Sequence, residues 1–413
     1  MLLYRMLSLF AVAGFALAAN LAVTGSVCTI TPGTNVTADD TPSILSAFQQ
    51  CSSDASIVIS EGTYNINQVM ETTGLKNVTI DLQGTLLWST DISYWRANGL
   101  PLNYLNMTSA WVLGGEDITF DGHGYGTLNG NGQVWYDFSN GVGNLAGRPI
   151  SLIIANTTNS VFTGIQFVQS QFWTMAITQS DSLLLTDIYV NSTSNDGTST
   201  ENTDGVDTFF SNNITFRRWS VTNGDDSIST KANSTNILIQ DCEFFNGNGF
   251  AAGSIGQYND TFEFIENVTM ERVVAYNTLW AGYIKSWTGT VEGYPPNGGG
   301  GGIGYAKNIT FRDITVHNLT GGITEITQCV SYNGDTSGCD TSTFQVSNYT
   351  IEDIRGTIYG GSLANLYCSV AAPCPGISLD FTNVGTNGTR NLTCSNVVGA
   401  DFECTGPAGY SPY

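Results

Sequence analysis

A short phrase repeats along the chain, and it constrains the fold more than any other feature. Each copy begins with a polar residue, usually Asn, and places apolar residues at offsets +1, +3, +6 and often +8. The shortest interval between copies is 23 residues, and turn-rich segments separate them. Strands that alternate apolar and polar residues and recur with one internal period predict a stacked solenoid. Clear copies begin at Asn213, Asn236 and Asn308, and looser ones at Asn77, Asp117, Asn159, Ser182, Asn267, Asn348 and Gly376.

We therefore predict an all-β, single-domain parallel β-helix over residues 20–413. A β-sandwich or a propeller is the alternative, but neither explains short strands that recur with a single internal period. The run from Thr41 to Gln50 has apolar residues at helical spacing and predicts a helix that caps one open end of the stack. No linker divides the chain, so we expect no second domain.

The first 19 residues have the pattern of a secretory signal peptide. Arg5 precedes an apolar stretch, and Ala16-Leu17-Ala18 supplies a cleavage site. A membrane anchor is the alternative, but it would need about 20 apolar residues. We therefore expect a secreted, extracellular glycoprotein without membrane attachment. Sequons for N-glycosylation agree with export and include Asn35, Asn77, Asn191, Asn267, Asn308 and Asn391.

Nine cysteines in an exported chain predict four disulfide bonds and one free thiol. Short separations favour local pairs. Cys242 is left over and lies between strand-like apolar residues, so we expect a buried thiol that serves packing. With two histidines and no Cys/His cluster, a zinc site or a Ser-His-Asp triad is poorly supported. The predicted pairs are Cys28–Cys51, Cys329–Cys339, Cys368–Cys374 and Cys394–Cys404.

The charge balance excludes one class of partner. The chain of 413 residues carries 13 Lys and Arg against 35 Asp and Glu, a formal net charge of -22. Phosphate binding needs a basic surface, so no nucleic acid partner is expected. The apolar content of 41% is that of a packed protein rather than a disordered one. An anionic substrate would have to be captured by few cations.

Carboxylates gather in one stretch of the repeat. Asp204 and Asp226 are 22 residues apart, which is about one coil, and Asp225 is adjacent. Neighbouring coils stack at about 4.8 Å, so the three side chains should face the same small volume. Glycoside hydrolysis needs such a group, with one protonated acid and one or two carboxylates. Spacing alone leaves two alternatives open, in which these residues form turns or bind calcium.

Motifs on successive coils favour the catalytic interpretation of these carboxylates over turn formation and calcium binding. The segments are Asn202-Thr-Asp204, Gly224-Asp225-Asp226, Gly253-Ser-Ile-Gly256 and Ile284-Lys285, with Ser170-Gln-Phe-Trp173 upstream. In this order they resemble glycoside hydrolase family 28, the polygalacturonase family of pectinases. The resemblance implies a right-handed, pectin-lyase-like β-helix that hydrolyses with inversion and uses no metal or organic cofactor. It also implies that Asp225 is the general acid and that Asp204 and Asp226 hold and deprotonate the attacking water.

Two positions depart from the family pattern and concern the substrate. Gly247-Asn248-Gly249 stands where most polygalacturonases have Gly-His-Gly, and Tyr283-Ile-Lys285 stands where they have Arg-Ile-Lys. A tyrosine cannot replace the bidentate carboxylate clamp of an arginine. Rhamnogalacturonan-acting members of the family also lack these residues. Substrate contacts are expected from Asn202, Lys231, Asn248, Tyr283, Lys285 and Trp287.

The long loop after Lys285 suggests how the cleft is closed. It runs from Ser286 to Gly304, and Trp287 and Tyr294 are expected to stack on sugars. A solvated insertion is the alternative. Closing one end of a groove favours exo action, so we expect a monomeric exo-acting enzyme that releases galacturonate from pectin. An exo-acting rhamnogalacturonan hydrolase is the first alternative, and a non-catalytic pectin-binding wall protein is the second.

Overall fold

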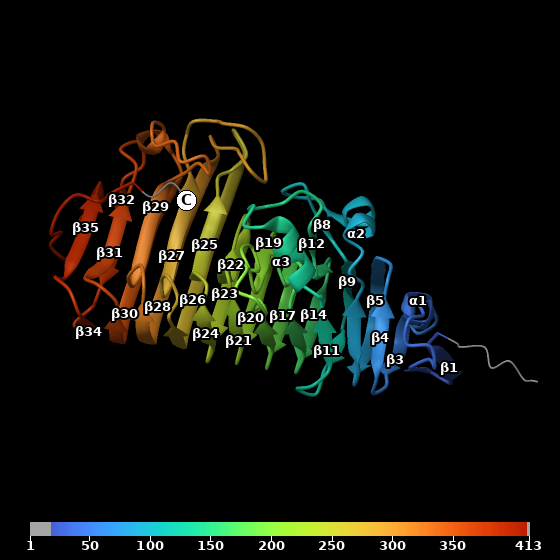
Figure 1. Cartoon of the computed structure of the whole chain (residues 1–413). Coiled ribbons are helices and arrows are strands. Elements are labelled where there is room, and N and C mark those ends of the chain that lie inside the picture. Colours follow the sequence, from blue (N-terminus) through green and yellow to red (C-terminus); the bar gives the residue numbers. More distant parts are fainter. Residues whose placement is uncertain (1–17, 411–413) are drawn as a thin grey trace, which may run out of the picture.

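The computed structural model describes residues 18–410, and it is an elongated right-handed parallel β-helix (Figure 1). The predicted fold class is therefore confirmed. The body of the signal peptide predicted over residues 1–19 lies outside the described residues. The strands stack coil upon coil from the N-terminal end to the C-terminal end, and nearly all strand pairs are parallel. Apolar side chains of successive coils fill one continuous core along the axis.

Three parallel sheets form the walls of the solenoid. The first sheet consists of β9 (Trp111–Glu116), β13 (Leu152–Ala155), β16 (Met175–Thr178), β19 (Asp207–Phe209), β22 (Asp226–Thr230), β25 (Gly249–Ile255), β27 (Gly282–Trp287), β29 (Thr324–Val330), β31 (Ser362–Tyr367) and β35 (Asn391–Ser395). The second consists of β2 (Val27–Thr31), β3 (Ser53–Ile59), β5 (Met70–Leu82), β10 (Thr119–Asp121), β14 (Thr158–Thr163), β17 (Asp181–Thr186), β20 (Asn212–Arg217), β23 (Ser234–Gln240), β26 (Phe262–Tyr276), β28 (Ile303–Leu319), β30 (Gln345–Ile358) and β33 (Ile377–Leu379).

The third sheet is the shortest in strand length. It consists of β4 (Thr63–Ile66), β6 (Thr85–Trp88), β11 (Thr127–Asn129), β15 (Gln166–Val168), β18 (Tyr189–Asn191), β21 (Ser220–Asn223) and β24 (Glu243–Asn246), and it continues through the C-terminal parts of β26, β28 and β30 to β34 (Asn383–Thr386). The strands of this sheet follow those of the second sheet after a sharp corner, so one coil passes through all three walls.

The asparagines of the sequence repeat lie at corners of the coils. Asn236, Asn267 and Asn308 have φ angles of 55°, 59° and 57°, a left-handed conformation that Asn tolerates better than most residues. Their side chains form a ladder, because Asn267 Nδ2 donates to Asn236 Oδ1 and Asn308 Nδ2 donates to Asn267 Oδ1, both at 3.1 Å. The repeated Asn therefore serves as a turn residue and as a link between coils.

A helix covers the N-terminal end of the stack, as predicted. At the N-terminal end, helix α1 (Thr41–Gln50) buries Ile44, Ala47 and Phe48 against the core, beside the antiparallel strand β1 (Asn20–Thr24). All four predicted disulfides are present, with Cys28–Cys51 at this end and Cys394–Cys404 at the other. Cys242 is free and buried, and burial raises the pKa of its thiol to about 12.

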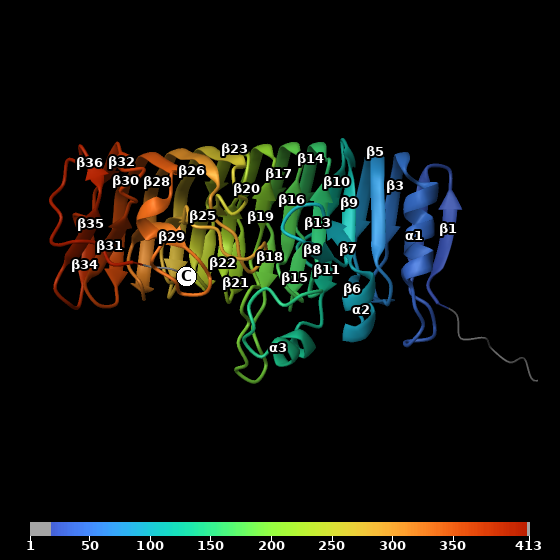
Figure 2. The ribbon, with the colours of Figure 1, turned by 90° about the horizontal axis from the view of Figure 1, so that it is seen from above.

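Several excursions leave the solenoid on one side (Figure 2). They include α2 (Ile92–Asn98), the hairpin β7–β8 (Leu100–Leu102 and Met107–Ser109), α3 (Gln133–Ser139) and β12 (Pro149–Ile150). Nearer the C-terminus lie the 3-10 helix η1 (Cys339–Thr341) and the short pair β32 (Cys374–Pro375) and β36 (Val397–Val398). A search of the described residues finds no helix with the length and apolar character of a membrane span.

Candidate active site

Strand register brings the predicted carboxylates together. Asp207 of β19 pairs with Ser229 of β22, so Asp204 lies one coil below Asp226, and the Gly205 amide donates to the Asp226 carbonyl at 2.9 Å. Each of the three side chains of Asp204, Asp225 and Asp226 has a carboxylate oxygen within 4.8 Å of the others. They line a cleft of about 520 Å³ on the first sheet. The other lining residues are Gly143, Asn144, Trp173, Glu201, Asn202, Gly224, Lys231, Asn248, Lys285, Asn297 and Tyr332.

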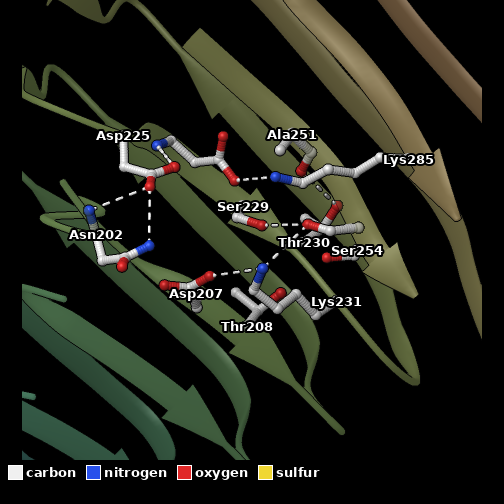
Figure 3. Close-up of polar contacts among 12 residues, drawn as sticks. Asn202, Asp207, Thr208, Asp225, Ser229, Thr230, Lys231, Ala251, Ser254 and Lys285 are labelled. Atoms are coloured by element: carbon white, nitrogen blue, oxygen red, sulfur yellow. Dashed lines mark hydrogen bonds and ion pairs between the residues drawn. The ribbon is translucent and has the colours of Figure 1, made fainter. Parts of the chain in front are cut away.

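Amide groups surround Asp225 (Figure 3). One carboxylate oxygen accepts from the Asn248 side chain at 3.0 Å and from the Asp226 amide at 2.8 Å. The other accepts from the Asn202 side chain at 3.1 Å and from the Asn202 amide at 3.2 Å. These four donors fix the orientation of the carboxyl group. Asn202 and Asn248, both predicted to contact substrate, therefore also position Asp225.

Asp226 has different partners. One of its oxygens accepts a hydrogen bond from the Tyr283 hydroxyl, and the other lies 3.1 Å from Lys285 Nζ. Lys285 also donates to the Tyr283 hydroxyl at 3.0 Å, which closes a ring of three side chains. Tyr283 is fully buried. Its hydroxyl contacts two residues that line the cleft, Asp226 and Lys285, and a direct contact between Tyr283 and substrate stays a prediction.

Burial and mutual repulsion raise the pKa values of two of the cleft carboxyl groups. Burial raises the pKa of Asp225, and the neighbouring charge of Asp226 raises it further. Burial also raises the pKa of Asp204 well above its usual range, with added repulsion from Asp225, Asp207 and Asp226. Burial would lower the pKa of Lys285, but the Asp226 carboxylate outweighs this effect and raises it. The site therefore contains two buried carboxyl groups whose pKa values are raised, those of Asp225 and Asp204, next to a cation.

Lys231 is the second cation on the cleft wall. Its ammonium lies 3.2 Å from Asp207 (Figure 3) and donates to the Gly253 carbonyl at 3.1 Å. It also stands 5.4 Å from the centre of the Trp173 ring. Asp207 is completely buried, and this burial raises its pKa to about 7. Lys231 is thus a neighbour of the cleft, as expected, but its charge is already opposed by a carboxylate beneath the surface.

The exposed aromatic residue that lines the cleft is not the predicted one. Trp287 is 1% exposed and packs edge-on against Tyr332, with ring centres 4.7 Å apart. A ring this buried has no free face for a sugar, so the stacking role expected for Trp287 is corrected. Tyr332 is 38% exposed, lines the cleft and bonds to Ser254 through its hydroxyl at 2.7 Å. Tyr294, by contrast, is exposed on the loop and meets Tyr258.

Sequence reasoning missed Arg148, a buried residue behind the cleft. Its guanidinium lies over the rings of Phe172 and Tyr136, at 5.2 Å and 5.9 Å from their centres. It donates to the carbonyl of Gln171 and, at 2.9 Å, to that of Glu201, which lies in the loop that carries Asp204. It makes no ion pair in the described part of the chain, and Nη2 has no hydrogen-bond partner there. No motif marked this position.

We expect Arg148→Met to lower kcat by roughly tenfold and to move the basic limb of the pH–rate profile upward. The reason is that the positive charge of Arg148 interacts with the carboxyl groups of Asp204 and Asp225 and favours their ionised forms. Removing a cation raises the pKa of a nearby acid, so the acid keeps its proton to higher pH. Arg148→Lys should restore part of kcat. A lower kcat with an unchanged pH profile for Arg148→Met would show that the residue acts only as a structural clamp.

Contacts between excursions enclose the cleft. Asn297, on the loop after Lys285, donates to the Asn144 carbonyl at 3.4 Å, so segments from two distant parts of the chain meet there. Gln257 holds the same loop through the carbonyls of Pro296 and Gly298 at 3.0 and 2.9 Å. On the hairpin β7–β8, Tyr104 donates to Glu263 at 2.5 Å. The loop is thus tied into the structure, which argues against a solvated insertion.

The spacing of the three aspartates would also suit a cation, which was the calcium alternative. The hydrogen bonds and the ion pair that these aspartates already make are unfavourable for a bound cation. Four N–H donors already approach the oxygens of Asp225, and the Lys285 ammonium stands beside Asp226. A divalent cation would have to displace these donors and face the lysine charge.

A β-helix cleft with converging carboxylates, one among amide donors and one beside a cation, is the arrangement that glycoside hydrolysis by acid and base catalysis needs. The model of glycosyl hydrolases family 28 matches residues 51–405. The chain therefore belongs to this family and is a glycoside hydrolase.

Curated relatives of known name are similar over most of the chain. An alpha-L-rhamnosidase, rgxB, from Aspergillus niger is 46% identical over 386 residues, covering 92% of this chain and 90% of the relative. Exopolygalacturonase X from Aspergillus niger is 35% identical over 346 residues, covering 82% of this chain and 78% of the relative. Among solved structures, endo-xylogalacturonan hydrolase from Aspergillus tubingensis aligns with a TM-score of 0.80 at 24% identity, covering 93% of this chain and 100% of that one. This last likeness shows the fold.

Proposed function

We propose that the protein is a secreted, exo-acting glycosidase that removes terminal α-L-rhamnose from rhamnogalacturonan-type pectic chains. The observation that carries this proposal is the pairing of both cleft lysines with carboxylates of the protein itself. The relative that is 46% identical and named an alpha-L-rhamnosidase supports it. The signal sequence and the density of sequons support export.

The cleft charge favours a neutral sugar at the position whose bond is cleaved. Lys285 is engaged by Asp226 and Tyr283, and Lys231 by Asp207. Glu201 adds a further carboxyl group to the lining, and burial raises its pKa. At pH values where Asp207 is ionised, a galacturonate carboxylate placed here would meet acidic groups and two cations that carboxylates already neutralise. Rhamnose is a 6-deoxy sugar without a carboxylate, so it would avoid this cost.

The three aspartates would divide the chemistry between them. Asp225, with its raised pKa, would give its proton to the glycosidic oxygen as the bond breaks. Asp226, held by Tyr283 and Lys285, would accept a proton from the attacking water. Asp204 has one buried oxygen without a hydrogen-bond partner in the described residues, and that oxygen would bind the same water. Oxygens no more than 4.8 Å apart suit a bridging water with hydrogen bonds of about 2.8 Å.

The enclosure of the cleft supports exo action. The contact between Asn297 and Asn144 joins two excursions across the cleft, and Tyr294 continues the wall towards Tyr258. A second contact links Tyr258 to the β7–β8 hairpin, because its hydroxyl accepts from the Leu105 amide at 2.9 Å. Walls joined in this way would admit the end of a chain more easily than its middle.

Exo-acting release of galacturonate is the second candidate function. Two observations favour it: Lys285 and Lys231 both line the cleft, and relatives named exopolygalacturonases share 33–35% identity. In this case the substrate carboxylate would have to compete with Asp226 and Asp207 for the two lysines.

Product analysis separates these functions. We expect the purified protein to release free rhamnose from rhamnogalacturonan oligosaccharides that end in rhamnose, and little galacturonate from polygalacturonate. Anion-exchange chromatography of timed digests measures both. Galacturonate as the main product would establish the second candidate instead. Binding of the oligosaccharides without any product would establish the non-catalytic pectin-binding alternative.

We further propose that hydrolysis inverts the anomeric carbon, as the family resemblance implies. The two carboxyl groups of retaining glycosidases are usually about 5–5.5 Å apart, and those of inverting glycosidases about 6.5–9.5 Å apart. The nearest carboxylate oxygens of this site lie within 4.8 Å of one another, so the proposal of inversion rests on the family and not on this distance. Proton NMR of the first turnovers should show the sugar released with the opposite anomeric configuration, followed by slow mutarotation. Initial product with the configuration of the substrate would reject inversion and assign one aspartate as a nucleophile.

A further inference from the structure

The distribution of cations singles out one exposed arginine. Most exposed Lys and Arg side chains pair with a carboxylate, and two arginines of the described residues, Arg96 and Arg390, are exposed without one. Arg390 lies near the C-terminal end of the solenoid and donates to the carbonyls of Val384 and Phe381. Arg96 lies on α2, close to the active-site cleft. The paired cations are Lys76, Arg218, Arg272, Arg312 and Arg355.

Arg96 borders a groove between α2 and α3, which project from the same side of the solenoid (Figure 2). The groove has a volume of about 580 Å³. The guanidinium lies 5.3 Å from the centre of the Phe138 ring, and its Nε donates to the Ala146 carbonyl at 3.2 Å. These two contacts hold the side chain and leave its terminal nitrogens for another partner. Phe138 is 44% exposed, and Ser93 adds a hydroxyl to the lining.

The groove and the active-site cleft share a wall. Gly143 and Asn144 line the cleft, while Ala146 and Gly147 line the groove. Even a fully extended segment from Gly143 to Gly147 spans at most about 14 Å. One oligosaccharide bound by its end in the cleft is therefore long enough, after a few sugar units, to reach Arg96.

We propose that this groove is a second carbohydrate site, which binds a galacturonate residue of the same substrate chain beyond the cleaved bond. The proposal rests on the proposed function, because a rhamnogalacturonan chain carries a uronate at every second sugar. A guanidinium binds a carboxylate through two parallel hydrogen bonds, and an exposed aromatic ring packs against the apolar face of a sugar. The site supplies the uncompensated positive charge that the cleft lacks.

Kinetics with substrates of different length test the proposal. For the wild type, KM should fall as rhamnogalacturonan oligosaccharides lengthen, because longer chains reach the groove. Arg96→Gln should raise the ratio of KM for a long oligosaccharide to KM for p-nitrophenyl α-L-rhamnopyranoside by about tenfold. Phe138→Ala should raise the same ratio. Arg390→Gln, the matched exposed arginine, should leave it unchanged.

Equilibrium binding keeps the test independent of turnover. Isothermal titration of a rhamnogalacturonan hexasaccharide into the Asp225→Asn protein should show a Kd about tenfold lower than for Asp225→Asn combined with Arg96→Gln. The same hexasaccharide with its carboxyl groups reduced to alcohols should bind both proteins equally weakly. If Arg96→Gln leaves the Kd for the acidic hexasaccharide unchanged, the groove is not a uronate site. Absence of released rhamnose together with Arg96-dependent binding would reject the proposed function and keep the site.

Discussion

Asp225→Asn should reduce kcat on rhamnogalacturonan oligosaccharides by about 10³-fold while KM changes little. A positioned general acid contributes roughly 10²–10⁴-fold, and the variant cannot protonate the leaving oxygen. The loss should be much smaller with p-nitrophenyl α-L-rhamnopyranoside, because p-nitrophenolate leaves without a proton. Initial rates with both substrates provide the measurement.

The comparison with Asp226→Asn makes this test specific. A residue that activates water is needed for every leaving group, so Asp226→Asn should reduce both rates by similar factors. Equal losses for Asp225→Asn on the two substrates would contradict its role as the acid. Glu243→Gln, at an exposed carboxylate outside the cleft, is the matched control and should keep full activity.

The folded state of Asp225→Asn must be checked in the same experiment. Asp225 accepts from two backbone amides, of Asn202 and Asp226, one on each oxygen. A side-chain amide has one oxygen, so one of these N–H groups loses its acceptor, which costs about 1–3 kcal/mol. A modest fall in the unfolding midpoint is therefore expected, and the rates should be measured at least 15 °C below it.

Lys231→Met should destabilise the protein by about 3–5 kcal/mol at pH 8, because it leaves the buried Asp207 carboxylate without its cation. The loss should be much smaller at pH 5. Burial already raises the pKa of Asp207 to about 7, above its unfolded value, so its contribution to stability is full below about pH 4 and is lost as pH rises through 7. Removing the lysine raises that pKa further. Urea unfolding at the two pH values measures the difference.

Two further variants sharpen this prediction. The double variant Lys231→Met with Asp207→Asn removes both charges and should recover most of the stability at pH 8. Lys76→Met breaks an exposed pair with Glu116, which water and salt screen, and should leave the free energy of unfolding nearly unchanged at either pH. An equal loss for Lys231→Met at pH 5 and pH 8 would show that packing of the lysine stem, not charge, is what the site requires.

Local patterns in the sequence carried much of the fold. The repeated phrase predicted the stacked coils, and the structure shows that its Asn residues take the left-handed conformation that a turn requires. The helical spacing from Thr41 to Gln50 predicted α1 with its observed bounds, and close cysteine pairs predicted all four disulfides. Each of these features depends on residues that are near one another in the chain or separated by one coil.

In the candidate site too, contacts between residues one coil apart could be predicted, whereas contacts made by loop packing could not. Asp204 and Asp226 were placed together by counting one coil, and the register agrees. The burial of Trp287 and the exposure of Tyr332 could not be read in this way, because 45 residues separate them and loop packing decides which ring faces the cleft. Arg148 carries no motif, and its importance arises from contacts to Gln171 and Glu201 on two other coils.

The sequence by itself determined the solenoid and the meeting of three carboxylates, because both follow from a period that repeats along the chain. It also determined the capping helix and the disulfides, because these depend on residues that are near one another in the chain. The tertiary structure alone decided which charges remain available to a substrate. Lys285 and Lys231 look like free cations in the sequence, yet folding places each beside a carboxylate, whereas it leaves Arg96 exposed beside Phe138. Electrostatic pairing depends on distances of a few ångströms between coils and loops, and no local pattern encodes those distances.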